Sequence, residues 1–168
     1  MENSGKIAVN TSIIEEDTKQ EENTIKSETT KSNETKTETK KEEVKDPEFK
    51  MPVSGSIMKE FADNKLVYSN TLDVWTTHNG IDISADKTTV VKASAEGTVK
   101  SIKNDPRYGL TVIIEHTNGY KTVYSNLLST EFVVEGEKVK QGQSIGTVGT
   151  TSAFEVSDEP HLHFEIIK

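Results

Sequence analysis

Short runs of β-branched residues separated by glycine follow one another from residue 88 to the C-terminus. The runs are TTVVKASAEG (88–97), TVKSIKND (98–105), LTVIIEH (110–116), YKTVYSN (120–126), KVKQGQSIGTVG (138–149) and HLHFEIIK (161–168). Strands of this length with turn residues between them predict an antiparallel sheet or sandwich rather than alternating strands and helices. Because the domain shows no long amphipathic helix pattern, we expect a mainly β fold.

The clearest predicted hairpin runs from Leu110 to Asn126. Its tip, Thr117-Asn118-Gly119, contains an Asn-Gly pair, which tolerates the positive φ angles that tight hairpin turns require. Further glycines at 136, 142, 146 and 149 predict additional turns or bulges in the last third of the chain.

The N-terminal segment has a different composition. Residues 1–46 contain no Phe, Tyr or Trp, and every aromatic residue lies from Phe49 onward. A segment dominated by Glu, Lys, Thr, Ser and Asn cannot bury enough apolar surface to offset the entropy that ordering costs. We therefore predict a flexible polar tail over 1–46, disordered or partly helical around Ile13–Glu22, followed by a folded domain over 47–168.

Charge and composition exclude several classes of protein. The formal net charge is -8 and the chain has a single arginine, so we expect no nucleic acid partner. Cysteine is absent, which excludes disulfides and thiolate metal sites. No apolar run approaches the roughly 20 residues that span a bilayer. Because a polar tail of this kind often follows a membrane anchor, we expect an anchor that this sequence does not contain.

Two histidines lie two residues apart in His161-Leu162-His163, within a run that reads as a strand. Side chains in a strand alternate between faces, so both imidazoles project to one side and Leu162 to the other. This arrangement suits two metal ligands. A pair of surface histidines is the alternative.

A second cluster, His78-Asn79-Gly80-Ile81-Asp82, supplies an imidazole and a carboxylate four residues apart. Both are ligand types that zinc accepts, and three protein ligands with an open position are typical of a catalytic zinc site. The alternative is local: His78 caps a turn, and Asp82 binds its own backbone. Spacing alone leaves both interpretations open.

The strings HNGIDIS, VVKASAEGTVKSI, YGLTVIIEHTNGYKTVYSNL, VVEGEKVKQGQSIGTVGTT and HLHFEI together resemble the lysostaphin/LytM family of zinc metallopeptidases. Members of this family cut peptide cross-bridges in bacterial cell walls. The resemblance covers about residues 50–168 and implies that His78, Asp82 and His163 ligate Zn²⁺. It implies that His161 does not ligate the metal but assists the reaction beside it.

One position departs from the family pattern. Where the family has Tyr-Ala-His-Leu with a further catalytic histidine, this chain has Tyr124-Ser125-Asn126-Leu127. The Asn126 amide can still donate a hydrogen bond, but it cannot carry a proton at neutral pH. Loss of a positioned acid-base group lowers a rate by roughly 10²- to 10⁴-fold. By the same resemblance, we expect His116 to brace the hairpin rather than to replace the missing histidine.

A LytM-like domain with a degenerate site behind a polar tail is similar to sporulation members of this family. That resemblance implies an extracytoplasmic domain anchored in the forespore membrane, which assembles with the mother-cell stage III sporulation protein AH. Peptidoglycan is a second expected ligand. An active zinc-dependent peptidoglycan endopeptidase is the main alternative. A lipoyl- or biotinyl-carrier domain, with Lys87 as the nearest modified lysine, is a weaker one.

Overall fold

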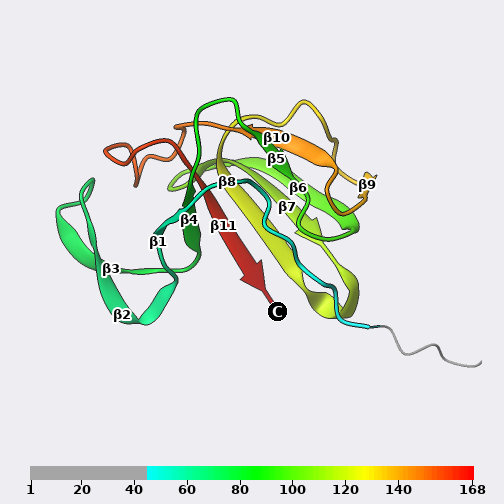
Figure 1. Ribbon diagram of the computed structural model, residues 1–168, viewed down its shortest axis with the longest axis horizontal. Helices are drawn as coiled ribbons and strands as arrows, with labels where there is room; N and C mark the ends of the chain where they lie inside the picture. The colour runs from blue at the N-terminus through cyan, green and yellow to red at the C-terminus, as the bar shows by residue number, and fades with distance from the viewer. Residues whose placement is uncertain (1–44) are drawn as a thin grey trace, which may run out of the picture. The chain divides into compact units, whose positions relative to one another are not determined.

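The computed structural model describes residues 45–168 of the chain, and strands are almost the only regular secondary structure in the described part (Figure 1). The strands are β1 (Ile57–Lys59), β2 (Ala62–Ser69), β3 (Val74–His78), β4 (Ile81–Ser84), β5 (Val90–Lys92), β6 (Gly97–Asp105), β7 (Gly109–Glu115), β8 (Lys121–Ser129), β9 (Lys138–Val139), β10 (Ser144–Val148) and β11 (His161–Ile167). One turn of 3-10 helix, Thr117–Gly119, joins β7 to β8.

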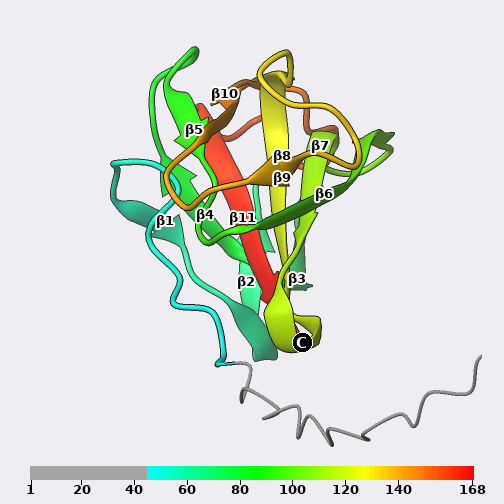
Figure 2. The same cartoon turned by 90° about the vertical axis from the view of Figure 1, so that its right-hand side faces the viewer.

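Nine strands form one sheet in the order β1-β4-β11-β8-β7-β6-β9, with β10 pairing to both β5 and β8. Every pair is antiparallel, which confirms the predicted mainly β, antiparallel fold. Strands β5, β9 and β10 cross one face of the central strands (Figure 2). Their buried residues Val91, Val139 and Ile145 join the same apolar core as Val112 of β7 and Leu162 of β11.

The period-two alternation of β11 and β4 separates this core from a second, polar face. Leu162 and Ile83 are fully buried in the core. His161, His163 and Asp82 alternate with these residues and project from the opposite face of the sheet, where they too are fully buried. Polar side chains buried to this degree require partners, so this face is where a functional site is expected.

The predicted hairpin is confirmed. Strands β7 and β8 pair from Leu110↔Leu127 to Glu115↔Lys121 with one register shift between Leu110 and Val112, and the tip has Asn118 at φ 55° and Gly119 at φ 79°. His116 braces the turn end of the hairpin, since Nδ1 lies 2.7 Å from the Glu96 carbonyl oxygen and Nε2 lies 2.7 Å from Thr122 Oγ1.

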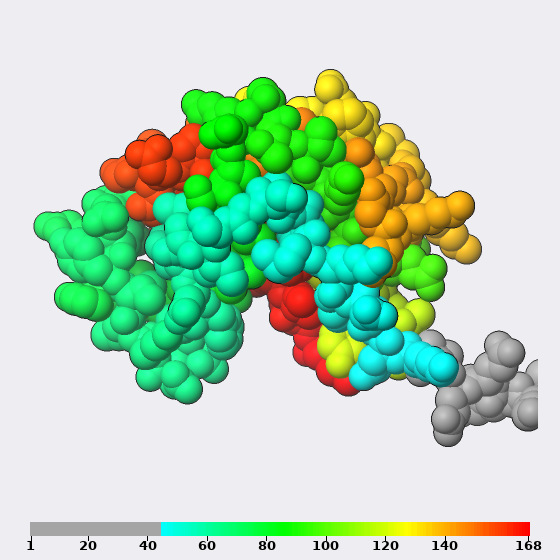
Figure 3. Space-filling model, in the orientation of Figure 1, coloured from blue at the N-terminus to red at the C-terminus, as the bar shows by residue number. Residues whose placement is uncertain are grey.

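Strands β2 and β3 pair only with each other and form an arm beside the main sheet (Figure 3). The arm exposes large apolar side chains, among them Leu66, Val74 and Trp75, and the Trp75 ring packs edge-on against Tyr68. The predicted strands began only at residue 88, so β1 to β4 were missed.

The predicted linker falls almost wholly on residues 1–44, which lie outside the described residues, so the division at residue 46 stays a prediction. No helix within residues 45–168 has the length and apolar composition needed to cross a membrane.

Candidate metal centre

His78, Asp82 and His163 converge although they lie on three different strands. His78 ends β3, and Asp82 of β4 stands directly opposite His163 of β11 in the ladder. Asp82 Oδ1 lies 3.1 Å from His78 Nε2 and 2.8 Å from His163 Nδ1, and these two nitrogens are 3.2 Å apart. The structure thus brings together the three residues that the sequence analysis selected.

The outer nitrogen of each imidazole is fixed by an acceptor. His78 Nδ1 lies 2.9 Å from the carbonyl oxygen of Glu60, and His163 Nε2 lies 3.1 Å from Glu165 Oε1. Because these oxygens only accept, the outer nitrogens carry protons, and the inner nitrogens are the ones that face Asp82 Oδ1 and would bind a metal after losing any proton they hold. The Tyr108 ring stacks on His163 at 4.3 Å and 10° and limits its rotation. Partners of this kind typically orient metal-binding histidines.

Charge holds the cluster together. Burial works to raise the pKa of Asp82, but hydrogen bonds from His163 and His78 outweigh it and hold that pKa well below its usual range. Burial works to lower the pKa of His163, but the carboxylates of Asp82 and Glu165 outweigh it and raise that pKa to about 9. When no metal is bound, Asp82 and His163 therefore form a buried ion pair at neutral pH.

The donor atoms suit a metal ion. Two imidazole nitrogens and a carboxylate oxygen are zinc-type ligands, and ligand atoms around tetrahedral zinc are separated by roughly 3.3 Å, close to the 2.8–3.2 Å found here. The second carboxylate oxygen, Asp82 Oδ2, lies 3.1 Å from Lys59 Nζ, so the charge of Lys59 faces it from outside the group of three ligands.

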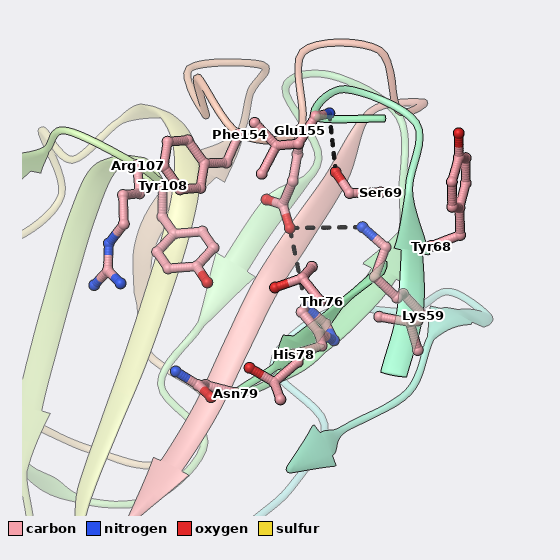
Figure 4. A pocket seen from close by; sticks show the side chains of 13 residues that line it. Lys59, Tyr68, Ser69, Thr76, His78, Asn79, Arg107, Tyr108, Phe154 and Glu155 are labelled. Carbon is pink, nitrogen blue, oxygen red and sulfur yellow. Dashed lines mark hydrogen bonds and ion pairs between the residues drawn. The ribbon is translucent and has the colours of Figure 1, made fainter. Parts of the chain in front are cut away.

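A fourth residue, Glu155, joins the cluster from the loop between β10 and β11. One donor atom each from His78, Asp82, Glu155 and His163 lie within 4.8 Å of one another, and all four residues are buried. Figure 4 shows the Glu155 carboxylate between His78 and Lys59. The sequence analysis missed Glu155 and Lys59, because neither follows a metal-ligand spacing or a strand period.

The cluster is reached through a cavity of about 150 Å³ beside the arm. Its lining includes Val67, Tyr68 and Leu72 of the arm. Tyr108 and Phe154 of the main body also line it, on the side away from Tyr68 (Figure 4). His78 and Glu155 are the members of the cluster that line this cavity.

His161 lies beside the cluster rather than in it. Its Nδ1 is 2.7 Å from the Glu159 carbonyl oxygen, and its Nε2 is 3.2 Å from Glu155 Oε2 and 3.3 Å from Asn126 Nδ2. Burial works to lower the pKa of His161, but the contact with Glu155 and the charge of Asp82 raise it overall. Its predicted role of assisting a reaction stays a prediction.

The Asn126 amide joins the loop that follows β10 to the start of β11. Its Oδ1 accepts hydrogen bonds from the backbone N–H groups of Thr151 and Ser152, at 2.7 and 2.9 Å. Its Nδ2 donates to the His161 carbonyl oxygen at 3.1 Å. The residue at the position of the expected catalytic histidine is therefore a loop anchor.

The family model of peptidase family M23 matches residues 76–168, which is more than half of the chain and includes every residue of this cluster. The chain belongs to peptidase family M23. This confirms the resemblance to LytM-type and lysostaphin-type peptidases. The matched segment includes Lys87, so the hypothesis of a lipoyl- or biotinyl-carrier domain is dropped.

Two relatives illustrate the range of M23 proteins that this chain resembles. It is 42% identical over 113 residues to Stage II sporulation protein Q of Bacillus subtilis (strain 168), covering 66% of this chain and 38% of that protein. It is 41% identical over 90 residues to the peptidoglycan DD-endopeptidase ShyA of Vibrio cholerae, covering 54% of this chain and 20% of that protein. The chain thus spans only a minor part of the curated relatives it matches.

The solved structures of similar fold likewise include both a sporulation complex and peptidases. A chain in the SpoIIQ-SpoIIIAH pore forming complex superposes with a TM-score of 0.62 at 33% identity, covering 73% of this chain and 84% of that one. A zinc containing peptidase from Vibrio cholerae superposes with a TM-score of 0.60 at 31% identity. The match covers 70% of this chain and 35% of that peptidase chain. The lysostaphin catalytic domain of Staphylococcus simulans superposes with a TM-score of 0.51 at 27% identity. The match covers 67% of this chain and 77% of that domain.

Proposed function

We propose that this M23 domain binds one zinc ion through His78, Asp82 and His163. Support comes from the two inner imidazole nitrogens and the carboxylate oxygen, which lie at mutual separations of 2.8–3.2 Å. Zinc held by three protein ligands can polarise a carbonyl and lower the pKa of water. The chain's own contribution is to orient both imidazoles through Glu60 and Glu165 and to shield the site behind Tyr108.

We further propose that the domain is a weak or inactive peptidase. The observation that carries this proposal is the hydrogen bonding of Asn126: its amide oxygen accepts from two backbone N–H groups, and its amide nitrogen faces both the carbonyl oxygen and Nε2 of His161. A group that is to stabilise charge developing on a substrate must aim a free donor at it. Asn126 therefore fits a structural role better than the role of the histidine it replaces.

The biological role that fits best is assembly of an intermembrane complex between forespore and mother cell. Stage II sporulation protein Q is the relative that shares the longest matched segment among those given above, and the SpoIIQ-SpoIIIAH structures contain chains of similar fold. By this proposal the domain is extracytoplasmic, is anchored in the forespore membrane and binds a protein of the SpoIIIAH type. Peptidoglycan is the second proposed ligand.

The zinc proposal is tested by metal analysis of freshly purified protein. About one zinc per chain is expected in the unmutated protein, and little in His78→Ala. His116→Ala is the matched control, because it also removes a buried histidine but lies in the β7–β8 hairpin. Failure of the unmutated protein to retain zinc after reconstitution would contradict the proposal.

The catalytic proposal is tested on purified peptidoglycan. Incubation with the zinc-loaded protein should release few or no fragments above the level of a His161→Ala control. Efficient cleavage that is lost in His161→Ala would overturn it. The assembly proposal is tested separately, by measuring binding to the SpoIIIAH-type protein of the same organism.

An active endopeptidase is the second candidate function, favoured by the cavity that opens onto the cluster and by the ShyA relative. Replacing Asn126 by histidine does not separate the two candidates. Histidine cannot accept both the Thr151 and the Ser152 N–H groups, so the loop would shift under either hypothesis. Fragment release by the unmutated protein is the measurement that decides.

A further inference from the structure

We propose that Glu155 is a fourth protein ligand of the metal, which closes the site from within the domain. This inference rests on the proposed zinc site. It concerns a residue that neither the H-x-x-x-D nor the H-x-H motif contains. It also offers a physical reason, separate from Asn126, for weak or absent catalysis.

The position of Glu155 is the first observation. Its Oε1 lies 3.9 Å from His78 Nε2 and 3.9 Å from His163 Nδ1, equally far from both imidazoles. The three motif residues are closer together, at 2.8–3.2 Å. Oε1 would have to approach both nitrogens by about 0.6 Å to reach the separation of roughly 3.3 Å that tetrahedral zinc requires, a movement that one side-chain rotation can supply. With only 6% of its surface exposed, Glu155 has little alternative contact with water.

The second oxygen of Glu155 is held in place. Ser152 Oγ donates to Oε2 at 3.0 Å, and His161 Nε2 lies 3.2 Å from the same oxygen. Ser152 is in turn bound through its backbone N–H to Asn126 Oδ1. The carboxylate is thus oriented toward the cluster by Asn126, Ser152 and His161, an arrangement typical of a supported ligand.

The balance of charge is the third observation. Two carboxylates beside two neutral imidazoles neutralise a divalent cation. Lys59 Nζ is the cation that faces them, at 3.1 Å from Asp82 Oδ2 and 3.7 Å from Glu155 Oε1. Its closest contact, however, is Asp158 Oδ2 at 2.9 Å, so Lys59 keeps a partner when a metal neutralises the other two carboxylates.

A closed coordination sphere has a functional consequence. Structural zinc sites have four protein ligands, whereas catalytic sites keep one position open. Glu155 stands between His161 and the other donors and lines the cavity through which a substrate would approach. His161 then acts as a positioning residue for Glu155, and Asn126 anchors the loop that contains Glu155.

Cobalt substitution and zinc competition test this inference. The variants are Glu155→Ala and the nearly isosteric Glu155→Gln. Glu159→Ala is the matched control, because it removes an exposed carboxylate from the same loop. Competition with a chromophoric chelator should show that both Glu155 variants bind zinc at least about tenfold more weakly, while Glu159→Ala binds as the unmutated protein does.

The absorption spectrum of the cobalt protein shows whether the metal has a coordination position that an external ligand such as azide can occupy. The unmutated protein should show intense four-coordinate absorption that azide does not change, and Glu155→Ala should respond to azide. Unchanged zinc affinity in Glu155→Ala would overturn the inference, and so would an azide response in the unmutated protein. Glu155→Ala that keeps its zinc but loses measurable peptidase activity would assign Glu155 as a general base instead. If His78→Ala also keeps its zinc, the proposed zinc site itself is wrong.

Discussion

At Asn126 the backbone has a φ of 64°, within the left-handed region that asparagine tolerates better than most residues. The same side chain accepts two backbone N–H groups from the loop after β10. One residue therefore satisfies an unusual backbone conformation and anchors the loop that carries Glu155. A histidine could adopt this backbone but could not form both hydrogen bonds.

Replacement of Asn126 by alanine should destabilise the domain by about 2 kcal/mol or more, because two backbone donors lose their acceptor. Asn126→Gly is the matched control, since glycine loses the same hydrogen bonds but accepts the positive φ. Alanine should cost roughly 1 kcal/mol more than glycine. Urea unfolding of the three proteins measures both differences. Equal stability of Asn126→Gly and the unmutated protein would show that the loop does not depend on these bonds.

The residues of the site differ in how far sequence could reveal them. His78, Asp82 and His163 were found because ligand types at fixed spacing matched a known family. Their convergence follows from the pairing of Asp82 with His163, which no local pattern specifies. Glu155 and Lys59 were not found, because the sequence around a single buried charged residue in a loop or a short strand looks the same as that around a solvent-exposed one. The burial of Glu155, which is 6% exposed, and its contact with the partly buried Lys59 exist only in the folded chain.

At the scale of elements, Gly80 allows the β3–β4 turn to lie against β11. A Cβ at this position would lie 2.5 Å from the Phe164 carbonyl oxygen and 3.0 Å from the His163 ring. The backbone oxygen cannot move aside cheaply. Glycine therefore permits the close approach that places His78 and Asp82 against His163.

Gly80→Ala should push the turn away from β11 and weaken zinc binding by about 10- to 100-fold, comparable to the loss of a supporting residue at a metal site. Gly119→Ala is the control: its φ of 79° strains an alanine, but no atom lies within 4 Å of the added Cβ. It should cost about 1 kcal/mol in stability and leave zinc affinity unchanged. Chelator competition together with urea unfolding separates the two effects. A Gly80→Ala protein with normal zinc affinity would contradict the steric argument.

The strands that sequence analysis found and missed also differ physically. The β7–β8 hairpin was predictable because its turn residues and apolar runs agree, and its strands are buried in the core. In β2 the segment from Asp63 to Leu66 is exposed without interruption, so no period-two alternation marks a buried face. The arm pairs only with itself, and a two-stranded ribbon outside the core leaves little signal in a sequence.

At the scale of the whole domain, the proposed metal joins parts of the chain that are far apart in sequence. His78 ends the arm, Asp82 lies in β4, His163 lies in β11, and Glu155 lies in the loop before β11. A ligand that binds only the folded state stabilises it in proportion to the logarithm of its concentration. Zinc should therefore act as a cross-link in a domain that contains no cysteine.

Removal of zinc should lower the thermal midpoint of the domain. Zinc at 100 times its dissociation constant contributes about 2.7 kcal/mol, which for a domain of this size corresponds to a shift of roughly 10 °C. Thermal unfolding followed by circular dichroism, with zinc and with excess chelator, measures the difference. His78→Ala should unfold at one midpoint under both conditions, because it lacks a ligand. Chelator-insensitive unfolding of the unmutated protein, with zinc shown to be bound beforehand, would mean that the metal does not hold these segments together.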